Sequence, residues 1–193
     1  VYVFTQGGGA WSQQAYVKAH NTAGGPMVKA VKFGGNLALS ADGNTLAVGA
    51  GSEDNTGAGI NPPATERSLS FSSAGAAYVF ARSNGTWSQQ VYLKASNARQ
   101  NQNYGSSLAL SADGNTLAIG ALNDTDGGAS GMPVISTVNP KGSVHVYQRS
   151  TTKWSQRAYL KTQINWSRGI ALSGDGATLA VGAPDERSQS TGI

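Results

Sequence analysis

A block of eleven residues occurs three times in this chain, and the repetition restricts the fold more than any other feature of the sequence. The block reads SADGNTLAVGA in its first copy, and it stands at residues 40–50, 111–121 and, in a looser form, 173–183. A second block, WSQQVYLK, occupies residues 87–94 and matches residues 11–18 and 154–161. Successive copies lie 62 to 76 residues apart, so the chain contains three copies of a unit of this length.

Each unit predicts four short β-strands. Residues 37–39 and 46–48 alternate large and small side chains around Asp42-Gly43-Asn44, which is a strong signal for a tight hairpin. A second strand pair, residues 77–80 and 90–93, is joined across a turn at Asn84-Gly85. The pattern has a period of two and no helical period. A repeated four-stranded antiparallel unit is typical of β-propeller blades, so we predict an all-β fold made of such blades.

The blade pattern divides the chain into a half blade, two whole blades and a second half blade. These parts are residues 1–19, 33–94, 104–161 and 166–193. Propellers close with about four to eight blades, so three repeats are incomplete as a single closed ring. Two explanations are open. The sequence is a piece of a longer protein, or copies of it pool their half blades into a six-bladed ring or an open fibre.

The repeat motifs resemble those of the FG-GAP repeat family, the integrin-α-type β-propeller, and particularly its bacterial surface-protein branch. The first motif stands as Phe33-Gly34 and Tyr104-Gly105 and degrades to Trp166-Ser167. The second motif begins at Gly49, Gly120 and Gly182, and only the last copy keeps its proline, Pro184. The resemblance implies a seven-bladed propeller in the complete molecule, at the cell surface or secreted. It implies adhesion, ligand binding or an accessory role rather than one activity.

Many FG-GAP repeats carry a calcium loop between their first two strands, but the corresponding hairpin is short here. It holds one carboxylate per repeat, from Asp42, Asp113 or Asp175. Calcium takes about six to eight oxygen ligands, which this hairpin does not supply. We therefore expect these aspartates to accept hydrogen bonds from the backbone of their own turns.

A more acidic loop follows the second strand of each repeat, where Glu53, Asp124 and Glu186 share one position. Its middle copy, with Asn123, Asp124 and Asp126, is the candidate Ca²⁺ site, and backbone carbonyls and water would complete the ligand shell. The alternative is a solvated acidic turn that binds no cofactor.

Fourteen of the fifteen aromatic residues recur at equivalent positions of the repeats. A residue that every blade requires is expected to pack between blades. Only Phe71 falls outside the pattern, in the long loop of residues 51–74. It either tucks this loop against the blade or anchors a binding partner.

Charge and composition argue against several functions. The net charge is +4, but the basic residues are scattered along the chain, so we expect no nucleic-acid binding. No apolar run approaches the ~18 residues of a membrane-spanning helix. The chain has no cysteine and two histidines, neither of which lies near a nucleophile motif. We therefore expect a protein that is not an enzyme.

Three functional hypotheses remain. The leading one is a non-catalytic interaction or adhesion module, extracellular or at the cell surface. In it, the insertions 51–74 and 122–141 project from one face to bind a protein or glycan. The second is a structural subunit of an extracellular filament or oligomer that self-associates through its split blades. The third is a carbohydrate-binding or accessory propeller of a secreted enzyme.

Overall fold

The computed structural model describes residues 1–21, 31–63, 72–125, 142–161 and 169–183, and these residues form twelve β-strands and no helix. The strands are β1 (Tyr2–Gly7), β2 (Ala10–Tyr16), β3 (Asn36–Leu39), β4 (Thr45–Ala50), β5 (Ala76–Ser83), β6 (Thr86–Leu93), β7 (Tyr104–Leu110), β8 (Thr116–Ala121), β9 (Ser143–Ser150), β10 (Lys153–Leu160), β11 (Ile170–Leu172) and β12 (Leu179–Val181). A search of these segments finds no helix with the length and apolarity needed to cross a membrane.

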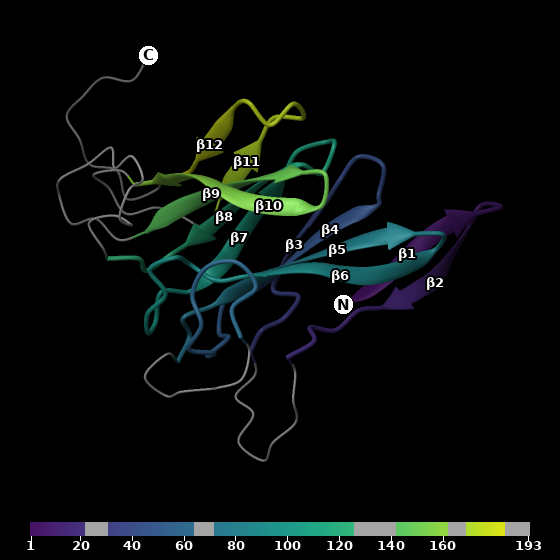
Figure 1. The fold of residues 1–193 in the computed structure, drawn as a ribbon. Helices are drawn as coiled ribbons and strands as arrows, with labels where there is room; N and C mark the ends of the chain where they lie inside the picture. The colour runs from purple at the N-terminus through teal and green to yellow at the C-terminus, as the bar shows by residue number, and fades with distance from the viewer. Residues whose placement is uncertain (22–30, 64–71, 126–141, 162–168, 184–193) are drawn as a thin grey trace.

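The strands form four antiparallel sheets that follow one another along the chain (Figure 1). The two central sheets have the strand orders β3-β4-β5-β6 and β7-β8-β9-β10, so each is a meander of four consecutive strands. The outer sheets are the two-stranded pairs β1-β2 and β11-β12. The predicted fold class is therefore confirmed: two four-stranded antiparallel blades lie between two half blades, and the described strands form no closed ring.

Each junction between neighbouring sheets has its own hydrophobic core. The core between the two whole blades holds Val79 and Leu93 from one sheet and Leu117, Ile119 and Tyr147 from the other. Smaller cores join β1–β2 to the first blade and β11–β12 to the second. Because the alternating side chains of a strand point to opposite faces, every blade supplies residues to two junctions. This arrangement explains why the aromatic positions recur once per repeat.

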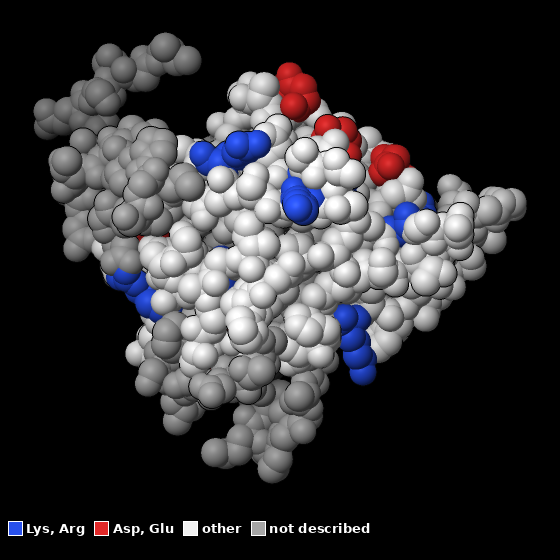
Figure 2. Space-filling model, viewed as in Figure 1, with Lys and Arg blue, Asp and Glu red and all other residues white. Residues whose placement is uncertain are grey.

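The hairpins between the first two strands of each repeat have the same structure. The Asp42 carboxylate accepts hydrogen bonds from the Ser40 hydroxyl (2.5 Å) and the Asn44 backbone N–H (2.9 Å). Asp113 and Asp175 accept equivalent bonds in their own hairpins, and these bonds lower the pKa of all three carboxyls. The expectation that these aspartates bond to their own turns is confirmed. Figure 2 shows three separate acidic patches along the edge where Figure 1 places these hairpins.

The glycines of the family motifs allow two backbones to come close together at the blade junction. Gly105 has a φ of +83°, and a Cβ atom there would lie 2.1 Å from the carbonyl oxygen of Ala76. A Cβ atom on Gly49 would lie 2.2 Å from the carbonyl oxygen of Gly105. The second motif of one blade therefore packs directly against the first motif of the next, and side chains at these positions would separate the sheets.

Gly105→Ala should destabilise the fold by at least about 2 kcal/mol, because it combines a left-handed backbone with a direct clash. Gly85→Ala is the matched control, since Gly85 has a φ of +78° but has no atom within 4 Å of the added methyl group. Urea denaturation of both variants measures the difference. Equal losses of unfolding free energy would show that the close approach at Gly105 is unimportant.

Candidate functional site

The acidic position that follows the second strand of each repeat is buried in both whole blades. Glu53 is 4% exposed and Asp124 is fully buried. Neither of these two carboxylates is therefore exposed to solvent. The sequence alone did not show which groups surround the carboxylates, because the surrounding residues come from other strands and from the preceding sheet.

The Glu53 carboxylate connects three parts of the fold. Lys94, which directly follows β6, places its Nζ 2.5 Å from Oε2 in a buried ion pair. The Tyr92 hydroxyl of β6 donates to Oε1 at 3.1 Å. Asn21, which follows β2 in the half blade, donates its amide to Oε1 at 3.3 Å and accepts from the Tyr78 hydroxyl. Glu53 thus joins the inner and outer strands of its own blade to the sheet that precedes it.

The Asp124 carboxylate has the same surroundings one blade later. Its side-chain hydrogen-bond donors include the hydroxyls of Ser143 (2.6 Å) and Tyr159 (2.8 Å) and the amide of Asn97 (3.3 Å). The Lys161 ammonium donates to the backbone carbonyl of Asp124 at 3.0 Å, and the His145 Nε2 lies 4.0 Å from the carboxylate. Asn97 and Asn21 each stand three residues after the repeated lysine, so the two clusters use the same repeat positions.

Burial shifts the pKa of the lysines, tyrosines and histidine of these clusters. It lowers the pKa of Lys94 and of Lys161, although the neighbouring carboxylate opposes the shift in each case. Burial likewise raises the pKa of Tyr78, Tyr92 and Tyr159 and lowers that of His145. The groups are enclosed and bonded to one another, which is the arrangement of a structural network rather than of a site open to a ligand.

The described part of the candidate calcium site does not fit a cation. The oxygens of the Asp124 carboxylate face hydroxyl and amide donors, and the Asn123 side chain donates to the Asn101 carbonyl at 3.1 Å. Among the residues that the structure describes, no group of three His, Cys, Asp or Glu side chains could hold a metal. Asp126 lies outside these residues, so the site as a whole stays a prediction. Phe71 and Glu186 also lie outside them.

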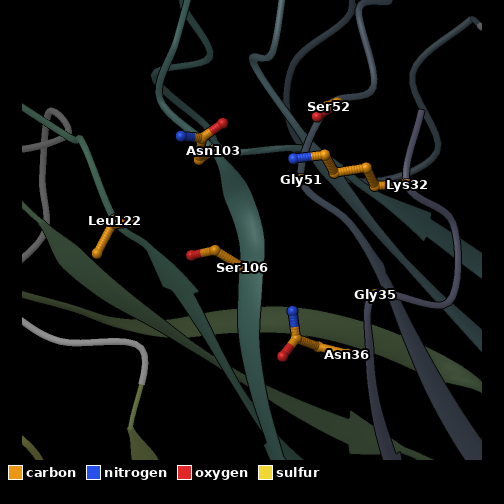
Figure 3. A pocket seen from close by; sticks show the side chains of 8 residues that line it. All are labelled: Lys32, Gly35, Asn36, Gly51, Ser52, Asn103, Ser106 and Leu122. Carbon is orange, nitrogen blue, oxygen red and sulfur yellow. The ribbon is translucent and has the colours of Figure 1, made fainter. Parts of the chain in front are cut away.

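A polar pocket lies between the inner strands of the two whole blades (Figure 3). Its volume is about 260 Å³. The lining residues are Lys32, Gly35, Asn36, Gly51, Ser52, Asn103, Ser106 and Leu122. Asn36 begins β3, Ser106 lies on β7, and Gly51 and Leu122 directly follow β4 and β8. The pocket was missed at the sequence level because its wall combines four separate loops and strand ends.

The backbone around the pocket has an unusual conformation. Lys32 and Asn103 both have left-handed φ angles, of 54° and 55°. Asparagine adopts this conformation readily, whereas lysine does so rarely. Such a conformation persists only where the surrounding structure holds it, and it is often found at functional sites. Lys32 brings a positive charge to a wall that otherwise offers amide and hydroxyl groups.

Glu53→Ala should reduce the unfolding free energy by about 3–5 kcal/mol, because Lys94 would keep a buried charge without its partner. The double variant Glu53→Ala/Lys94→Met should be more stable than the single variant by about 1–3 kcal/mol, since it removes the orphaned charge. Chemical denaturation of the three proteins gives both values. A single variant within about 0.5 kcal/mol of the wild type would contradict the structural role of the pair.

Comparisons with known proteins were consistent with the fold. Residues 87–133 match the family model of the FG-GAP repeat. This segment runs from β6 through the second motif of the next blade, and it contains Tyr104-Gly105 and Gly120-Ala121. No curated protein matches the chain. The match confirms the family resemblance that the sequence motifs predicted: the chain carries an FG-GAP repeat.

Proposed function

We propose that this chain is a non-catalytic interaction module, at the cell surface or secreted, that binds a protein or glycan through the polar pocket and the loops at its rim. One observation carries the proposal: the pocket lies where both insertions leave the blades. Gly51 and Ser52 begin the insertion 51–74, and Leu122 begins the insertion 122–141. A ligand held in the pocket would therefore contact the first residues of both insertions.

The chemistry of the pocket favours an anionic or hydroxyl-rich group. The Lys32 ammonium offers a charged donor, and the amides of Asn36 and Asn103 offer both donors and acceptors. Such groups suit a carboxylate on an acidic side chain or on an acidic sugar. The FG-GAP repeat supports this proposal, since it builds β-propeller modules that are commonly extracellular.

The proposal that the module is not an enzyme rests on the buried clusters. General acid–base chemistry needs a titratable group within reach of a substrate. The Glu53 and Asp124 clusters hold titratable groups with shifted pKa values, but hydrogen bonds and burial take them out of reach. Among the residues that line the pocket, Lys32 is the one titratable side chain, and a lone lysine does not supply an acid–base pair.

Binding to arrays of acidic glycans and acidic peptides, with the labelled protein as the probe, tests the proposal. Lys32→Glu should weaken binding to the best ligand at least tenfold, about 1.4 kcal/mol or more. Lys153→Glu is the matched control, because it makes the same charge change at an exposed residue of β10.

An equal loss in the two variants would mean that the binding is a general charge effect. Unchanged binding by Lys32→Glu would remove the pocket from the interaction. Ser106→Trp, which fills the pocket without changing the charge, should reproduce the loss seen with Lys32→Glu.

A further inference from the structure

Four polar side chains that line the pocket have no partner within the described part of the chain. No hydrogen bond or ion pair to another described residue involves the side chains of Lys32, Asn36, Ser52 or Asn103. The asparagine of the second buried cluster differs in this respect, since Asn97 donates its amide to a carboxylate. Polar groups inside a fold that bond to no protein atom usually bond to water or to a ligand. The four groups therefore favour a site that a bound molecule completes.

Ser52 shows this requirement most clearly. It lines the pocket and is 7% exposed, and its backbone N–H donates to the Val31 carbonyl at 3.3 Å. Its hydroxyl has no hydrogen-bond partner among the described residues. Leaving a hydroxyl in such a place unbonded costs free energy, so a molecule in the pocket would gain a hydrogen bond there.

The charge of the pocket selects an anion. Its lining residues carry one charge, that of Lys32, and no carboxylate. Glu53 directly follows Ser52 in the chain, but its carboxylate is held in the buried cluster by Lys94. An anionic group in the pocket would therefore meet the Lys32 ammonium without an opposing carboxylate on the pocket wall.

The two amide side chains indicate what else the ligand must carry. Asn36 and Asn103 each offer an NH2 donor and a carbonyl acceptor. A carboxylate only accepts hydrogen bonds, so it would satisfy the ammonium and the NH2 groups and leave the amide oxygens unbonded. Hydroxyl groups both donate and accept. A ligand with one carboxylate and several hydroxyls would thus satisfy the whole wall, whereas an Asp or Glu side chain would satisfy only part of it.

The size of the pocket agrees with a ligand as large as one sugar ring. Its volume is about 260 Å³, several times the ~30 Å³ that one water molecule occupies in the liquid. The carboxyl group of an acidic side chain has three heavy atoms and would leave most of this space to water. Leu122 offers an apolar surface for the C–H groups of a ring. None of the lining residues is aromatic, so binding would draw on charge and hydrogen bonds rather than on ring stacking.

Two glycines keep this junction open. Gly35 and Gly51 stand at the repeat positions of Ser106 and Leu122 in the next blade. At the following junction, the gap that Ser106, Leu122 and Ile170 help to line leaves no room for a water molecule. A Cβ atom on Gly51 would lie 3.9 Å from the Cα atom of Ser106, which is an ordinary contact. A side chain at position 51 would therefore fit the backbone and would occupy the space of a ligand.

We infer that this pocket binds one sugar residue of the uronic acid type, with its carboxylate at the Lys32 ammonium and its hydroxyls at the amides of Asn36 and Asn103 (Figure 3). The inference rests on the proposed function and narrows its ligand from a protein or glycan to a glycan that carries carboxylates. Charge-assisted hydrogen bonds are about twice as strong as neutral ones, so the carboxylate should contribute more than any single hydroxyl.

NMR titrations of the purified protein with matched small probes test this inference. The methyl glycosides of glucuronic and galacturonic acid carry both the carboxylate and the hydroxyls. The methyl glycosides of glucose and galactose lack the carboxylate, and N-acetylaspartate amide has the carboxylate without the hydroxyls. We expect at least one uronide to bind at least tenfold more tightly than its neutral counterpart and than N-acetylaspartate amide.

Filling the pocket should remove this binding. Gly51→Leu introduces the residue that the next blade has at this position, and it should weaken uronide binding at least tenfold. Gly7→Leu is the matched control, because Gly7 is exposed on β1 and no atom lies within 4 Å of the added Cβ. Unchanged circular dichroism of both variants shows that the fold is retained.

A second variant changes the charge of the wall while almost keeping its shape. Asn36→Asp places a carboxylate opposite the bound anion, so it should also weaken uronide binding at least tenfold. The effect on the fold should be small, because the Asn36 amide has no partner among the described residues. Asn84→Asp makes the same change at an exposed turn and should leave binding unchanged.

The possible results separate this inference from the proposed function. If N-acetylaspartate amide binds more tightly than both uronides and Gly51→Leu removes that binding, the sugar assignment is wrong but the pocket remains the binding site. Equal binding of the uronides and the neutral glycosides, or no uronide binding, would also overturn the sugar assignment. Uronide binding that neither Gly51→Leu nor Asn36→Asp weakens would contradict both proposals, because the sugar would then bind elsewhere.

Discussion

The buried carboxylate at each blade junction is the contact on which the rest of the structure depends. Glu53 and Asp124 each bind groups from the outer strands of their own blade and an asparagine from the preceding sheet. A buried charge is tolerated only when its partners are all in place, so the cluster fixes the positions of three segments at once. With 39% hydrophobic residues, the chain relies on such polar contacts as well as on its aromatic cores to set the order of the sheets.

The same requirement explains the location of the pocket. The loops that carry the carboxylates begin at the pocket, because each follows the second strand of a blade. The blade junction and the candidate binding surface are therefore built from consecutive parts of one segment. The buried carboxylate holds the start of each loop in place, and this is the part of the loop that a ligand at the rim would contact.

Much of the fold could be predicted from the sequence because residues that recur in each repeat occupy equivalent positions in the structure. The hairpins at Asp42 and Asp113, the four strands of a blade and the junction packing of Tyr78 and Phe80 all followed from recurring positions. The clusters around Glu53 and Asp124 could not be predicted in this way. Glu53 and Lys94, for example, are 41 residues apart, and a repeat shows which residues are equivalent but not which residues are in contact. The acidic position was noticed, but the donors that bury it come from other strands. The pocket was invisible for the same reason.

Hydrogen exchange on Glu53→Gln tests the role of the junction most directly. This variant keeps the shape of the side chain and removes its charge. We predict faster exchange in β6 and in the residues that follow β2, which both contact Glu53, with unchanged protection in β9 and β10, which surround Asp124 instead. Equal loss of protection in all sheets, or no change next to Glu53, would contradict the account.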